Sequence, residues 1–115
     1  MIPQITVQLY SVRDQAAADY EGTIRAIADM GFGLVEPAGF PGASAEQAAK
    51  LFKQLGLESP TAHSALPIGD NKNRVIEEAL LLGHKCLITG CPPNFSEDFK
   101  STDSIKATAA LYCEA

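Results

Sequence analysis

The sequence predicts an α/β fold of four consecutive strand–helix units with parallel strands. Three observations support this prediction. Short apolar segments alternate with amphipathic ones at intervals of about 25 residues. Glycines stand where three of the predicted helices end, at Gly31, Gly56 and Gly83. Each connection is long enough for the right-handed crossover that joins parallel strands. With 115 residues, the chain is expected to form a single domain over residues 1–115.

The first unit begins with a strand over residues 5–10, which read ITVQLY. Alternation places isoleucine, valine and leucine on one face, and threonine, Gln8 and Tyr10 on the other. A loop is expected over residues 11–18. A helix follows over residues 19–30, with Asp19 as its N-cap.

The second unit has a short strand over residues 33–37 and a Gly- and Pro-containing loop over residues 38–43. Its helix begins at Ser44, because Ser44 and Gln47 have the spacing of a capping box. The buried side of this helix is predicted to consist of Ala48, Leu51, Phe52 and Leu55.

The third strand is predicted over residues 58–64, with Thr61 and His63 on one face. Pro60 has no N–H, so this strand is expected to pair fully only beyond it. A helix over residues 70–82 follows. Its predicted buried residues are Val75, Ile76, Ala79 and Leu80.

The fourth strand is predicted over residues 85–91, where a Pro-Pro pair ends it. A loop to residue 101 leads to a helix capped by Thr102 and still continuing at Tyr112. We expect that helix to extend further in a complete protein, which would make this chain a truncated one.

Composition narrows the function classes. The net charge of −5 argues against a protein that binds nucleic acid or an anionic membrane, because such binding requires a basic surface. The N-terminus lacks a signal-peptide pattern, and no apolar run approaches about 20 residues, so a soluble, cytoplasmic protein is expected. Cys86, Cys91 and Cys113 do not suggest a disulfide framework or a zinc site, and are expected to be small buried side chains.

Polar residues stand at the ends of three predicted strands, where parallel α/β folds hold their ligands. These residues are Tyr10, Glu36 and His63, with Gln8 on the same face as Tyr10. Together they could bind a polyol, transfer a proton or hold a metal. Taken singly, they could equally be a packed tyrosine, a surface carboxylate and a structural histidine. Their shared position across three units favours a site.

Two further residues have functional and structural interpretations. Arg13 could hold an anionic group, pair with Glu36 or form a surface pair with Asp14. His84, before the fourth strand, is assigned a structural or surface role. The sequence contains no dinucleotide fingerprint, phosphate loop or nucleophile elbow. One histidine and one glutamate are too few ligands for a divalent metal.

Four segments resemble the xylose isomerase-like barrels, a family of sugar and sugar-phosphate isomerases and epimerases. VQLYSVRD at residues 7–14 is similar to the family's first strand and loop, and GFGLVEPAGF at residues 31–40 to its second. TAHS at residues 61–64 resembles its third strand, and VIEEALLLGHKCLI at residues 75–88 its third helix and fourth strand.

The resemblance implies the N-terminal half of an eight-unit (β/α)8 TIM barrel. It implies that Glu36 and His63 line a pocket for a sugar or sugar phosphate, with Tyr10 nearby. Gln8 and Arg13 complete the predicted substrate-binding set, and no catalytic residue is assigned. The family's divalent metal (Mn, Mg, Co or Zn) and its proton-transferring carboxylates belong to later strands. The chain alone is therefore expected to bind no metal and to be inactive.

Two alternatives stay open. The first is a non-catalytic half-barrel that forms a homo-oligomer through exposed strand edges, because open parallel edges favour pairing. The second is a small-ligand-binding α/β domain of the doubly wound type. In that fold helices would cover both faces of the first strand. The polar face of this strand argues against such burial.

Overall fold

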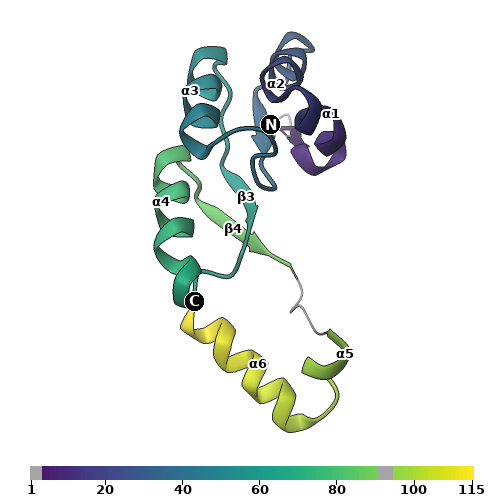
Figure 1. Cartoon of the computed structure of the whole chain (residues 1–115), viewed down its shortest axis with the longest axis vertical. Coiled ribbons are helices and arrows are strands. Elements are labelled where there is room, and N and C mark those ends of the chain that lie inside the picture. The colour runs from purple at the N-terminus through teal and green to yellow at the C-terminus, as the bar shows by residue number, and fades with distance from the viewer. Residues whose placement is uncertain (1–3, 91–94) are drawn as a thin grey trace.

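The structure is a computed structural model that describes residues 4–90 and 95–115. It has a mixed α/β arrangement with short parallel strands, and Figure 1 shows helices α3 and α4 stacked along one side of β3 and β4. The strands are β1 (Thr6–Gln8), β2 (Leu34–Glu36), β3 (Thr61–Ser64) and β4 (Cys86–Thr89). The helices are α1 (Arg13–Ala18), α2 (Tyr20–Asp29), α3 (Ala45–Leu55), α4 (Lys72–Leu82), α5 (Phe95–Asp98) and α6 (Thr102–Glu114), with 3-10 helices η1 (Leu9–Val12) and η2 (Gly69–Asn71).

The strands form two parallel pairs rather than one continuous sheet. β1 pairs with β2, with Gln8 opposite Glu36, and β3 pairs with β4. Isolated parallel bridges join the two pairs at Leu34–Glu58 and Ala38–His63. The predicted parallel pairing is thus confirmed, and the ladder is interrupted between β2 and β3.

The first strand is shorter than predicted, because it ends at Gln8 and Tyr10 lies on η1. Its partner strand β2 ends at Glu36, the residue opposite Gln8. The predicted loop over residues 11–18 was also wrong, because α1 occupies most of it. The polar face predicted for residues 5–10 therefore ends before Tyr10.

Local signals placed several helix ends correctly. Asp19 caps α2 by accepting a hydrogen bond from the Gly22 amide, and Ser44 and Gln47 form the predicted capping box of α3. Gly56 ends α3 with φ of 67°, a left-handed conformation that favours glycine. The prediction of Thr102 as a cap was wrong. Ser101 and Ser104 form a capping box one residue earlier.

The hydrophobic core lies between the first three helices and β2. Its buried members are Leu9, Ala16, Tyr20, Ile24, Ile27, Val35, Ala48, Leu51, Phe52 and Leu57. The second half of the chain is less buried, and α4 contributes only Val75 as a fully buried residue. The predicted burial of Ile76 and Leu80 was wrong, because they are 41% and 78% exposed. Both lie on a side of α4 that the described elements leave open.

The prediction that the cysteines are buried was also wrong for the two that lie in the described residues. Cys86 and Cys113 are exposed. Cys86 begins the edge strand β4, and Cys113 lies on α6, of which only Thr108 is buried. Cys91 and the predicted end of the fourth strand lie outside the described residues. Among the helices of the described ranges, none has the length and apolar character needed to cross a membrane.

Helices α5 and α6 form an arm that extends away from the strands (Figure 1). The predicted loop before residue 101 contains α5. The Tyr112 hydroxyl donates a hydrogen bond of 2.8 Å to the Gly90 carbonyl at the end of β4. The Cα radius of gyration is 16.2 Å, whereas about 13 Å is usual for a compact domain of this length. The arm makes the molecule elongated.

Candidate functional site

Three of the five predicted site residues meet at the interruption between β2 and β3. The Gln8 Nε2 atom donates to Glu36 Oε1 at 2.9 Å and lies 2.9 Å from His63 Nε2. His63 Nε2 is 3.2 Å from Glu36 Oε1. Adjacent parallel strands in register bring these side chains together, because Gln8 is opposite Glu36 and Ala38 bridges to His63. We call Gln8, Glu36, His63 and Thr61 the polar cluster.

Thr61 is the member that the site prediction missed. Its hydroxyl donates to Glu36 Oε2 at 2.5 Å. The sequence signal was available, because Thr61 and His63 are two residues apart on β3 and share a face. Glu36 thus uses both carboxylate oxygens to hold neighbouring side chains.

The polar cluster keeps Glu36 ionised. The hydrogen bond from Thr61 is the main cause that lowers the pKa of Glu36 below 4.5. The Gln8 amide and the nearby His63 ring lower this pKa further, against an opposing effect of burial. The Glu36 side chain is 15% exposed and that of His63 38%. A largely buried carboxylate therefore sits behind a more accessible imidazole.

Proton positions follow from the donors and acceptors. The Gln8 amide nitrogen carries two hydrogens, one for Glu36 Oε1 and one for His63 Nε2. With this Gln8 orientation, His63 Nε2 is an acceptor, and the ring of neutral His63 carries its proton on Nδ1. If His63 Nε2 carried a proton, it would donate to Glu36 and could no longer accept from Gln8. The Gln8 amide would then have to reorient. A protonated His63 ring would then pair with the Glu36 carboxylate 3.2 Å away.

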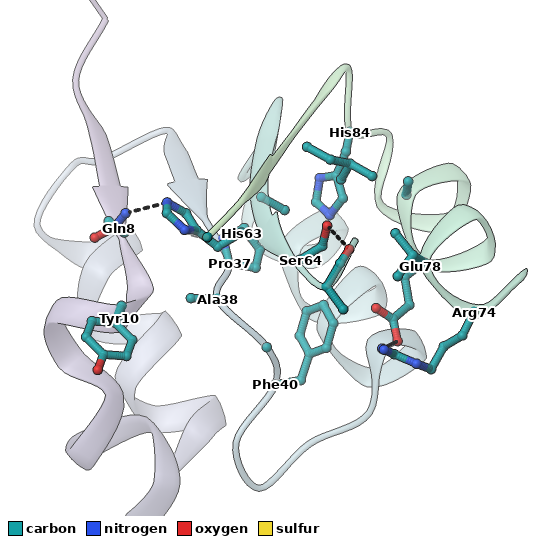
Figure 2. Close-up of a pocket in the computed structure, with 17 residues that line it drawn as sticks. Gln8, Tyr10, Pro37, Ala38, Phe40, His63, Ser64, Arg74, Glu78 and His84 are labelled. Atoms are coloured by element: carbon teal, nitrogen blue, oxygen red, sulfur yellow. Dashed lines mark hydrogen bonds and ion pairs between the residues drawn. The ribbon is translucent and has the colours of Figure 1, made fainter. Parts of the chain in front are cut away.

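Gln8 and His63 border a cavity of about 530 Å³, within the usual size range for small-molecule sites. Figure 2 shows the Gln8–His63 contact on one side of this cavity and the Arg74–Glu78 ion pair on the opposite side. Phe40 lies between them and supplies an aromatic wall. Glu36 does not line the cavity, so it acts by positioning the two side chains that do.

Tyr10 and Arg13 lie apart from the polar cluster. Tyr10 lines the cavity but is 56% exposed, and the Arg13 guanidinium lies 4.6 Å from its ring centroid. Arg13 donates to the Tyr10 carbonyl at 3.1 Å and lies 3.9 Å from the Asp14 carboxylate. Arg13 forms the surface pair with Asp14 and does not pair with Glu36.

His84 fixes the chain at the start of the third strand. Its Nδ1 atom lies 2.7 Å from the Ser59 carbonyl and 3.2 Å from the Ser59 hydroxyl. The carbonyl contact assigns the proton to Nδ1, because a carbonyl only accepts. His84 also borders the cavity at a distance from His63 (Figure 2). Its contacts agree with a structural role.

The described residues do not by themselves fit a divalent metal. They contain no group of three or more His, Cys, Asp and Glu side chains arranged to hold a metal ion. Glu36 and His63 offer two donors, and Gln8 and Thr61 already occupy the Glu36 oxygens. We therefore derive no chemical step through a metal.

Comparison of the sequence with models of protein families and with curated proteins gives no match.

The Thr61 hydroxyl is expected to stabilise the fold in a pH-dependent way. Thr61→Val keeps the branched shape and leaves Glu36 Oε2 without its donor, so the free energy of unfolding should fall by about 1–3 kcal/mol at neutral pH. The folded-state pKa of Glu36 lies below its ordinary value of 4.5, so this contribution is complete above pH 4.5. It should be lost as the pH falls through the lowered pKa. Urea unfolding of both proteins across this range measures the difference.

Thr89→Val is the matched control, because Thr89 is a half-buried strand threonine. No side-chain hydrogen bond of Thr89 occurs in the described part of the chain. A Thr61→Val effect that equals the Thr89→Val effect, or persists unchanged at acidic pH, would show that the Glu36 contact contributes nothing.

Proposed function

We propose that this chain supplies the substrate-binding half of a sugar or sugar-phosphate isomerase or epimerase site. The observation that supports this proposal is the convergence of the Gln8 amide and the His63 imidazole on one cavity, both held by Glu36. The same residues lie in the segments that resemble the xylose isomerase-like barrels. The half-barrel arrangement of four strand–helix units is part of this proposal.

The chemistry of the cavity suits a polyol. Sugar hydroxyls donate and accept hydrogen bonds, and the Gln8 amide and His63 ring offer both functions at one wall. The ionised Glu36 behind them makes this end of the cavity unfavourable for an anionic group. A sugar is therefore expected to bring hydroxyls to the polar cluster. Any phosphate on it would lie away from Glu36.

Apolar surface on the same cavity fits the carbon side of a sugar ring or chain. Phe40, Pro37 and Ala62 line it together with the polar residues. Small-molecule sites combine such apolar walls with a few placed polar groups. The contribution of His63 to catalysis would be proton exchange at Nε2, the nitrogen that faces both Gln8 and Glu36.

Calorimetric titration of the purified chain with ketoses and ketose phosphates tests the proposal. Saturable binding of a ketose is expected, with weaker binding of analogues that lack one hydroxyl. Isomerase and epimerase assays on the same samples, with and without added Mn²⁺, Mg²⁺, Co²⁺ or Zn²⁺, test for turnover. The absence of saturable binding for both ketoses and their phosphates would contradict the proposed substrate class.

A second candidate function is self-association. Within the described residues, β1 and β4 each pair on one side only, so two parallel edges stay open. Unpaired edges favour pairing with another chain. Size-exclusion chromatography with light scattering at micromolar concentration measures whether the chain is a dimer or larger.

A further inference from the structure

The cavity bordered by the polar cluster has no excess of positive charge. With its histidines neutral, the charged side chains among its described lining residues are Arg74 and Glu78, which have opposite signs. The Glu36 carboxylate adds a negative charge behind Gln8 and His63 at the other end. Phosphate esters are ordinarily bound by free Arg or Lys groups or by backbone N–H groups. The charge of this cavity therefore favours an uncharged ligand.

The Arg74 guanidinium is held by side chains of its own helix and of the turn before it. Its Nη1 atom donates to Glu78 Oε1 at 3.0 Å, and its Nη2 atom donates to Asn71 Oδ1 at 3.2 Å. Figure 2 shows Arg74 and Glu78 at the wall beyond Phe40, opposite the polar cluster. Glu78 is the more buried partner, with a side chain 28% exposed against 54% for Arg74. A ligand that reaches the guanidinium thus meets the Glu78 carboxylate beside it.

We propose that the cavity takes an unphosphorylated sugar and that Glu78 is the residue that excludes sugar phosphates. This inference rests on the proposed function and narrows its substrate class. A phosphate bound to Arg74 would lie beside the Glu78 carboxylate, and like charges placed together at a binding site oppose binding strongly. Specificity of this kind comes from a repulsive group as well as from attractive contacts.

The ion pair keeps hydrogen-bonding capacity for sugar hydroxyls. A guanidinium carries several N–H donors, and both oxygens of a carboxylate accept hydrogen bonds. The described contacts use only part of the donors of Arg74 and one oxygen of Glu78. Both ends of the cavity therefore offer donors and acceptors to the hydroxyls of an uncharged sugar.

Calorimetry with paired ligands tests the exclusion. The unaltered chain is titrated with a set of ketopentoses and ketohexoses and with the phosphate ester of each. A ketose should bind, and its phosphate should bind at least about tenfold more weakly. Glu78→Gln replaces the carboxylate with an amide of the same shape. The affinity for the phosphate relative to the parent ketose should then rise at least about tenfold. Circular dichroism checks that the variant folds, and an ion pair this exposed contributes little to stability.

Two further variants assign the effect to the ion pair. Glu77→Gln removes the same charge from the adjacent, exposed position of α4, which does not line the cavity. It should leave both affinities unchanged. Adding Arg74→Gln to Glu78→Gln should return the ratio of the two affinities to that of the unaltered chain, because the freed guanidinium is then gone.

The outcomes separate this inference from the proposed function. A ketose phosphate that binds the unaltered chain as tightly as its ketose would overturn the exclusion and leave the proposed function standing. An unchanged ratio in Glu78→Gln would overturn the role of Glu78, as would an equal rise in Glu77→Gln or a rise that persists in the double variant. Binding of neither ketoses nor their phosphates would contradict the proposed function and this inference together.

Discussion

Replacing Phe52 with alanine is expected to lower the free energy of unfolding by about 3–5 kcal/mol. Phe52 lies on α3, is 3% exposed and belongs to the core between the first three helices and β2. The substitution removes an aromatic ring and leaves a cavity that neighbouring side chains only partly fill. Small domains have a total stability of about 5–15 kcal/mol. Urea unfolding followed by circular dichroism should show a much lower midpoint.

Two control substitutions separate cavity formation from substitution as such. Tyr20→Phe, in the same core, keeps the ring and removes a buried hydroxyl that has no hydrogen-bond partner in the described structure. Met30→Ala shortens a side chain that is 73% exposed. Both should change stability by less than about 1 kcal/mol. A Phe52→Ala loss as small as these would mean that α3 does not pack on this core.

Replacing Gln8 with leucine should cause the largest loss of sugar binding. Gln8 is the member of the polar cluster that lines the cavity and contacts both Glu36 and His63. Leucine has a similar size and no polar atoms, so the cavity loses a hydrogen-bonding group and the imidazole loses its orienting partner. Removing a hydrogen bond between two neutral groups costs about 0.5–1.5 kcal/mol, so affinity should fall by roughly 2- to 13-fold.

Calorimetry measures this loss, and unfolding measurements on the same variant check that it is folded. Gln15→Leu is the matched control, because Gln15 is an exposed residue on α1 outside the cavity. It should bind the sugar as the unaltered chain does. If Gln8→Leu and the unaltered chain bound a ketose with equal affinity, the ketose would bind outside the polar cluster.

Local chemistry explains why some of the fold could be predicted from sequence. The Asp19 cap, the Ser44–Gln47 capping box and the Gly56 stop are each decided by residues within one helical turn. The meeting of Gln8, Glu36 and His63 follows from parallel pairing in register, which the strand–helix alternation predicts. The oligomer, sugar and metal predictions concern molecules other than the chain and stay predictions.

The failures arose where distant residues decide the outcome. Tyr10 lies outside the polar cluster because the chain enters η1 directly after Gln8, although the residue alternation up to Tyr10 is that of a strand. Ile76 and Leu80 have helical periodicity typical of burial, but periodicity states only which face is apolar. Whether another element covers that face depends on the course of the chain beyond β4. Thr61 was missed because it precedes the strand end on which the site prediction concentrated.

The interruption between β2 and β3 has a mechanical consequence. Backbone pairing holds β1 to β2 and β3 to β4, whereas two isolated bridges and the polar cluster join the pairs. The side chains that face the cavity therefore also help to join the two strand pairs, together with the packing of α3 on α4. A ligand that binds Gln8 and His63 together would hold these pairs in one relative position and stabilise the protein in proportion to its occupancy. Slower amide exchange across this joint would then report binding, even when no chemical reaction takes place.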